Sequence, residues 1–199
     1  VDSGFQADLS QLHVTTKGPQ TGSVARVQEA INLVSNTTVS GAAVYLNEGT
    51  YVEDVVINKS DLRLTKVATA DRDNVVLRGV ATQSSSSILP PAPNVAVMAD
   101  RVTIDQLTIQ SPLVASGRYS GGLVVNGDNV RIADNRFFSQ GSGLCVAIES
   151  YREGDVASPH VNGLVIEDNV FQGIPSQGYI AVYLAKQNAL SSDVVIQNN

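Results

Sequence analysis

The sequence has 199 residues, enough for one domain with a sizeable core or for one long solenoid. Charged residues make up only 16% and the formal net charge is −6, which argues against nucleic acids and anionic membranes as partners. The single cysteine, Cys145, excludes an intrachain disulfide and a cysteine-based metal site. No apolar run approaches the roughly 20 residues that are needed to span a bilayer.

The N-terminal part predicts a strand and one short helix. Residues 1–22 are irregular except for a strand at Leu12–Thr16. Ser23 is placed to cap a helix over 23–35, whose apolar residues recur at helical spacing on one face. Such a helix would lie across the open N-terminal end of a solenoid and bury its first coil.

Short strands follow along the rest of the chain. The first ones are expected at Ala42–Leu46, Val52–Ile57, Leu62–Lys66, Val75–Arg78 and Val95–Met98. Three strands then recur in each coil: Val102–Leu107, Thr108–Gln110 and Leu123–Asn126; Val130–Ala133, Arg136–Phe138 and Leu144–Ile148; Leu164–Glu167, Val170–Gln172 and Ile180–Leu184. Short strands that recur in threes and close no hairpins favour an all-β fold, a right-handed parallel β-helix with an N-terminal capping helix.

A repeated phrase supports the solenoid. Ile132–Phe137 returns as Ile166–Phe171 and begins again at Ile196–Asn199, with a fainter copy at Ile104–Ile109. The first residues of these copies, 104, 132, 166 and 196, are 28, 34 and 30 residues apart. Unequal periods of this size are typical of a solenoid whose loops differ in length.

The asparagine of each phrase predicts a structural ladder. Asn135, Asn169 and Asn199 would sit at a bend in the left-handed region, and their amides would hydrogen-bond from coil to coil. We expect a single β-helix domain over 1–199, with the strand and capping helix in 1–41 and the coils in 42–199. Because the last copy stops at Asn199, the sequence suggests a fragment of a longer solenoid.

Several stretches resemble the pectin-methylesterase-like branch of the pectin-lyase-type β-helices. Val24–Ile31 is similar to that family's opening helix, and Val44–Glu53 contains its motif of a hydrophobic strand followed by Gly-x-Tyr-x-Glu. Val95–Asp100 and Val102–Gln110 resemble the coil that follows. The resemblance covers about Leu12 to Phe138 and implies the β-helix fold.

The catalytic motifs that the resemblance implies are missing. The family uses two aspartates, glutamine side chains for the oxyanion and an arginine that orients one aspartate. The first aspartate would align with Ser142, and Gly141 stands where the glutamine is expected. The second would lie near Gln177–Ile180, where no acid is present. A working methylesterase is therefore not expected.

Two other groups of residues are candidate sites. The insertion Glu149–Asn162 offers Glu149, Arg152 and His160 as candidate catalytic groups, because long loops on a rigid scaffold often bind ligands. Tyr151 and Arg152, with Tyr183 and Lys186 one coil on, are candidate substrate-binding residues. An alternative is a polar loop in which Arg152 pairs with a neighbouring glutamate.

The acids at one corner are candidate calcium ligands. Asp134, Glu167 and Asp168 would stack at one corner of neighbouring coils, with Asp105 below. Carboxylates are ligands that Ca²⁺ prefers, although aspartates are also common at turns for structural reasons. We therefore expect no resident cofactor, with Ca²⁺ as the alternative.

Three function classes remain open. The first is an extracellular or cell-surface β-helix that binds a polysaccharide or glycan or has a structural role. The second is a polysaccharide-active lyase, glycosidase or esterase whose site is the groove beside the 149–160 loop. The third is a self-assembling element that associates through an open coil edge. The missing methylesterase acids favour the first class.

Overall fold

The computed structural model describes residues 10–17, 25–34, 41–80, 93–111, 119–138, 144–150, 161–173, 179–184 and 193–199, and only the backbone of 119, 120, 144–147, 149 and 150. The chain forms short strands and one α-helix, α1 (Arg26–Leu33), with a short 3-10 helix, η1 (Arg72–Asn74). The early strands are β1 (Gln11–Val14), β2 (Ala42–Leu46), β3 (Gly49–Val52), β4 (Val55–Ile57), β5 (Leu62–Lys66), β6 (Val75–Arg78) and β7 (Pro93–Val97). The later ones are β8 (Thr103–Asp105), β9 (Thr108–Gln110), β10 (Tyr119–Val125), β11 (Arg131–Ala133), β12 (Arg136–Phe138), β13 (Leu144–Ser150), β14 (Val165–Glu167), β15 (Val170–Gln172), β16 (Tyr179–Leu184) and β17 (Val195–Gln197).

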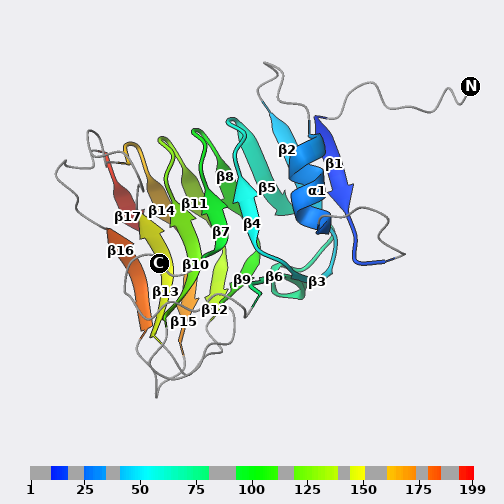
Figure 1. Ribbon diagram of the computed structural model, residues 1–199. Coiled ribbons are helices and arrows are strands. Elements are labelled where there is room, and N and C mark those ends of the chain that lie inside the picture. The colour runs from blue at the N-terminus through cyan, green and yellow to red at the C-terminus, as the bar shows by residue number, and fades with distance from the viewer. Residues whose placement is uncertain are drawn as a thin grey trace, which may run out of the picture.

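The strands form three parallel sheets that run along the length of the molecule (Figure 1). The seven-stranded sheet has the order β1-β2-β5-β8-β11-β14-β17. The sheet called here the β4 sheet has the order β4-β7-β10-β13-β16, and the β3 sheet has the order β3-β6-β9-β12-β15. From β2 onward, successive strands of the chain pass from sheet to sheet, and the pairings between described strands are all parallel. The all-β, right-handed parallel β-helix that the sequence predicts is confirmed.

The core consists of side chains stacked from coil to coil. Ile104, Ile132 and Ile166 occupy one register position of the seven-stranded sheet and are fully buried, as the repeated phrase predicts. In the β3 sheet the rings of Phe137 and Phe171 stack, with centroids 5.2 Å apart. Each buried side chain of this size contributes about 1.5–3 kcal/mol relative to an exposed one, so the rows stabilise the stack of coils.

Most predicted strands lie where the sequence places them. The boundaries agree for Ala42–Leu46, Leu62–Lys66, Val75–Arg78, Thr108–Gln110, Arg136–Phe138 and Val170–Gln172. The prediction of one strand over Val52–Ile57 is wrong, because β3 ends at Val52 and β4 begins at Val55. Glu53, between them, is 5% exposed and hydrogen-bonds to α1, which takes these residues out of the regular strand.

The asparagine ladder is confirmed. Asn135 Nδ2 donates to Asn169 Oδ1 at 3.2 Å, and Asn169 Nδ2 donates to Asn199 Oδ1 at 3.0 Å. The same oxygens accept backbone N–H groups from the coil before, and the ladder ends where Leu107 N donates to Asn135 Oδ1. The ladder therefore satisfies buried backbone groups in several coils.

The left-handed residue is not the ladder asparagine itself, so that part of the prediction is wrong by one position. Positive φ angles of 53–59° occur at the preceding residue of each coil: Gln106, Asp134, Asp168 and Asn198. The short polar side chains of aspartate and asparagine tolerate this conformation better than most residues.

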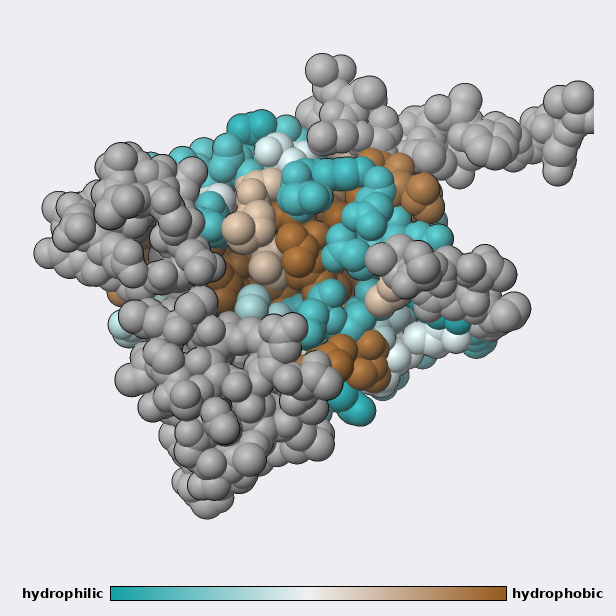
Figure 2. Space-filling model, in the orientation of Figure 1, coloured by the Kyte–Doolittle hydropathy of each residue, from teal (hydrophilic) through white to brown (hydrophobic). Residues whose placement is uncertain are grey.

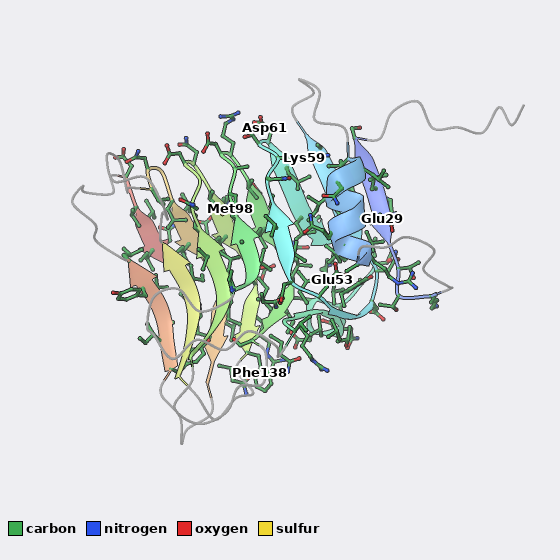
Figure 3. The ribbon with its side chains drawn as sticks, viewed as in Figure 1. Glu29, Glu53, Lys59, Asp61, Met98 and Phe138 are labelled. Atoms are coloured by element: carbon green, nitrogen blue, oxygen red, sulfur yellow. The ribbon has the colours of Figure 1, made fainter. Side chains whose placement is uncertain are left out.

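The helix α1 covers the N-terminal end of the solenoid and is held at both ends by residues near β4. Ser23 lies outside the described residues, and Ala25 at the N-cap position has no side-chain oxygen. The Glu53 carboxylate accepts the Val27 N–H and Gln28 N–H instead, at 3.0–3.1 Å. At the other end the Lys59 ammonium donates to the Asn32 and Val34 carbonyls (Figure 3).

The Gln28 side chain also continues the β4 sheet at its edge. Its amide oxygen accepts the Val56 N–H at 2.7 Å, and its amide nitrogen donates to the Val56 carbonyl at 3.1 Å. A neighbouring strand would make the same two bonds, so a side chain of α1 pairs the edge of β4 that would otherwise expose backbone groups.

Candidate functional site

The outer face of the β4 sheet carries a row of side chains that crosses the coils. Alternation puts Val55 and Ile57 in the core, so their neighbour Val56 points outward. The pairing places five residues in one row: Val56, Ala96, Val124, Glu149 and Tyr183. Val56 is 43% exposed, Val124 is buried, and Tyr183 is half-buried. The row thus begins with an apolar strip of three residues, Val56, Ala96 and Val124, and continues with Glu149 and Tyr183 in the next two coils.

Figure 2 shows that hydrophobic residues gather near the middle of the face that carries β4, β7 and β10. Met98 follows β7 and is 49% exposed. Asn126 follows β10, and its amide nitrogen lies 3.7 Å from Met98 Sδ. Its amide oxygen is buried and has no hydrogen-bond partner among the described residues. An apolar strip with a few polar groups beside it is the usual lining of a small-molecule or glycan site.

The structure brings two of the predicted site residues together. Glu149 lies on β13 and pairs in register with Tyr183 on β16, so their backbones are neighbours on one sheet. Tyr151, Arg152, His160 and Lys186 lie outside the described residues. Their roles, and the catalytic role of Glu149, remain predictions.

The predicted calcium ligands occupy two adjacent rows on one corner. Asp134 and Asp168 are the left-handed residues of their coils, and Glu167 is the last residue of β14. Asp134 pairs with Arg72 at 2.9 Å, and Glu167 pairs with Arg131 at 2.6 Å. Hydrogen bonds from Gln197 and Arg131 hold the pKa of Glu167 below its usual range. A cation at either acid would compete with an arginine.

Asp105, predicted to lie below these acids, is paired with Arg63. Within the described part of the chain, no three His, Cys, Asp or Glu side chains lie close enough together to hold a metal ion. Calcium binding therefore remains a prediction that rests on the sequence alone.

A polar cleft that the sequence analysis missed lies at the N-terminal end of the seven-stranded sheet. It has a volume of about 700 Å³ and is lined by Thr15, Lys17, Asn47, Glu48, Gly49, Val67, Thr69, Ala70 and Asn74. These residues follow the carboxyl ends of β1, β2 and β5, which are neighbouring parallel strands. Because parallel strands end at the same edge, their polar turns gather at one corner. That topology is the signal by which the cleft could have been found.

Partly buried hydrogen bonds hold the turn Asn47–Gly49 that lines the cleft. The Tyr51 hydroxyl lies 3.0 and 2.9 Å from the carbonyl oxygens of Val14 and Asn47 and donates its single hydrogen to one of them at a time. Burial raises the pKa of Tyr51 to about 12. Asn47 Nδ2 also donates to the Val14 carbonyl at 2.9 Å. Gly49 has φ +150°, and a Cβ there would meet the Thr16 side chain at 2.6 Å. The turn that lines the cleft therefore needs a glycine.

No helix in the described residues is long and apolar enough to cross a membrane.

Comparisons with known proteins found similarity only at the level of structure. No protein-family model and no curated protein matches the sequence. A pectin methylesterase from rice weevil aligns with a TM-score of 0.46 and 15% identity, over 76% of this chain and 53% of that one. PemA, a pectin methylesterase from Erwinia chrysanthemi, aligns with a TM-score of 0.42 and 11% identity, over 86% of this chain and 68% of that one. The Aspergillus niger pectin methylesterase aligns with a TM-score of 0.36 and 13% identity, over 94% and 89%.

The solved structures named above are pectin methylesterases, the family that the sequence motifs resemble. The chain spans about half the length of the rice weevil enzyme. At these TM-scores the similarities carry no argument about activity, and the fold assignment rests on the strand pairing itself. Ser142, which the sequence predicts to align with the first catalytic aspartate of the family, lies outside the described residues, as do Gln177 and Gly178 of the stretch Gln177–Ile180 near which the second is expected.

Proposed function

We propose that this chain is a glycan-binding β-helix module that acts outside the cell or at the cell surface, without pectin methylesterase activity. The observation that supports the proposal is the row of the β4 sheet in which the apolar residues Val56, Ala96 and Val124 are followed by Glu149 and then Tyr183. The flat, apolar faces of sugar rings pack on such strips, and a tyrosine offers both a ring face and a polar tip. The parallel register repeats the strip in successive coils, which suits an extended polymer.

Tyr183→Ala is the variant that tests this site. An aromatic contact contributes about 0.5–1.5 kcal/mol beyond the area that it buries, so we expect roughly 3- to 10-fold weaker polysaccharide binding. Isothermal titration calorimetry with the polysaccharide that binds the parent chain best would measure the change. Tyr45→Ala is the matched control, because Tyr45 lies on the seven-stranded sheet, stacked on His13. Equal affinity of the parent chain and Tyr183→Ala would remove this face as the binding surface.

A polysaccharide-active enzyme is the second candidate. The register that favours it pairs the backbone of Glu149 with that of Tyr183 on the neighbouring strand. Under this alternative Glu149→Gln abolishes the release of new reducing or unsaturated ends and leaves binding in place. Absence of such ends with the parent chain would exclude the alternative.

A further inference from the structure

We propose that the cleft at the carboxyl ends of β1, β2 and β5 is a second saccharide-binding site, which takes a neutral, hydroxyl-rich sugar unit. The cleft opens at the corner between the seven-stranded sheet and the β3 sheet, because the residues after β2 lead directly into β3. It shares no residue with the apolar row on the β4 sheet. The proposal therefore does not depend on the binding role of Tyr183.

The lining offers donors and acceptors that match sugar hydroxyls. Lys17 supplies an ammonium, Glu48 a carboxylate, Thr15 and Thr69 hydroxyls, and Asn47 and Asn74 amides. Neighbouring hydroxyls on one ring can donate to a carboxylate and accept from an ammonium at the same time. Val67 and Ala70 add small apolar surfaces for the C–H groups of the ring.

Both charged side chains keep bonding capacity for a ligand. Lys17 is exposed, and within the described part of the chain its ammonium makes no ion pair. Glu48 uses one carboxylate oxygen, Oε1, to accept the Asp71 N–H at 3.0 Å, which holds the side chain in place. Its other oxygen accepts no hydrogen bond from the described residues, so a ligand hydroxyl could donate to it.

The charge balance favours a neutral ligand over an anion. Lys17 and Glu48 carry opposite formal charges that cancel in the lining. The adjacent charges in the sequence, Lys66 before Val67, Asp71 after Ala70 and Asp73 before Asn74, sum to −1, which also disfavours an anion. A phosphate or an acidic sugar would meet the Glu48 carboxylate as well as the ammonium, whereas a neutral sugar uses both.

The size and rigidity of the cleft agree with this assignment. A volume of about 700 Å³ falls within the range of about 300–1,000 Å³ that is usual for small-molecule pockets. The hydrogen bonds of the Tyr51 hydroxyl hold the turn in place, and Gly49 permits the turn to approach the Thr16 side chain closely. A preorganised lining loses little conformational entropy when a ligand binds.

The test is a nuclear magnetic resonance titration of the ¹⁵N-labelled chain with neutral cello-, manno-, galacto- and xylo-oligosaccharides, and with a galacturonate trimer as the acidic comparator. We expect at least one neutral oligosaccharide to shift the Asn47 and Asn74 side-chain amides and the Gly49 backbone amide. Lys17→Met and Glu48→Gln should each weaken that binding at least fivefold with an unchanged amide spectrum elsewhere. Arg101→Gln, at the exposed Asp61 pair on another corner, and Tyr183→Ala should leave it unchanged.

Three results would overturn the proposal. The first is no shift of the cleft amides with any neutral oligosaccharide at millimolar concentration. The second is binding that both Lys17→Met and Glu48→Gln leave intact. The third is a response to the galacturonate trimer alone, which would contradict the neutral ligand class. If Tyr183→Ala abolishes polysaccharide binding while the cleft stays silent, the second site fails and the proposed function stands.

Discussion

Asn135→Ala is expected to destabilise the chain by roughly 3 kcal/mol or more, because the side chain serves several buried backbone groups at once. Asn135 is fully buried, its Oδ1 accepts the Leu107 N–H, and its Nδ2 donates to the Ile104 carbonyl. Each buried polar group that is left without a partner costs about 1–3 kcal/mol. The midpoint of urea-induced unfolding, followed by far-ultraviolet circular dichroism, measures the loss.

Position along the ladder provides the control for this prediction. Asn199 makes the same kind of bonds, accepting the Asn169 N–H, but it is exposed, so water can replace part of its contribution. Asn199→Ala should therefore cost much less than Asn135→Ala. Equal losses for the two variants would show that burial of the ladder does not determine its contribution to stability.

Glu53→Ala is expected to destabilise the chain by about 2 kcal/mol and to release α1 from the end of the solenoid. The substitution leaves the Val27 and Gln28 N–H groups without their acceptor. Loss of a helix N-cap costs about 0.5–2 kcal/mol, and unpaired buried N–H groups add to that cost. Amide hydrogen exchange in Arg26–Leu33 should be faster in Glu53→Ala than in the parent chain, with a smaller increase in the central coils.

Asp54→Ala is the matched control, since the neighbouring carboxylate accepts the Val80 N–H rather than the N–H groups of Val27 and Gln28. Exchange in α1 that is no faster in Glu53→Ala than in Asp54→Ala would contradict the capping role of Glu53.

The same carboxylate gives the chain a dependence on pH with a defined sign. Burial raises the pKa of Glu53 above the ordinary value of 4.5. The folded state then binds this proton more tightly than the unfolded state, so the contribution of Glu53 to stability falls as pH rises from about 4.5 through the raised pKa. The unfolding free energy of the parent chain minus that of Glu53→Gln should therefore decrease over that interval. Urea titrations at successive pH values measure it, and a difference that grows would contradict the assignment.

The parts of the fold that could be predicted from the sequence are those set by periodicity. Side chains alternate across a strand, so the inward position of Ile132 and Ile166 follows from the repeated phrase alone. The asparagine ladder could be predicted because the repeated phrases carry their asparagine at the same position, three residues after the first isoleucine. The helix cap could not be predicted, because Ser23 is a good local cap in the sequence whereas Glu53 reaches Val27 from the turn between β3 and β4.

The Gly-x-Tyr-x-Glu stretch shows why a resemblance can indicate a fold without indicating an activity. Gly49 avoids Thr16, Tyr51 bonds to the Val14 carbonyl, and Glu53 caps α1. All three residues fix the N-terminal end of the solenoid. Their roles are structural, so the motif predicts the architecture and is silent about the chemistry.

The candidate sites were predicted less completely, for a topological reason. Tyr183 could be predicted as a site residue because it lies one coil after the strand that the long insertion follows. The cleft was missed because Lys17, Glu48 and Thr69 are far apart in sequence and meet only where three parallel strands end. A turn such as Asn47–Gly49 looks in the sequence like any other hairpin or corner turn.

An array of acidic and neutral polysaccharides, read for binding and for new reducing or unsaturated ends with and without Ca²⁺, tests the central claim most directly. We predict binding to at least one polysaccharide, no new ends, and weaker binding by Tyr183→Ala. New ends would instead identify a polysaccharide-active enzyme. No binding and no cleavage would contradict the glycan-binding function, and sedimentation velocity would then test self-association of the chain.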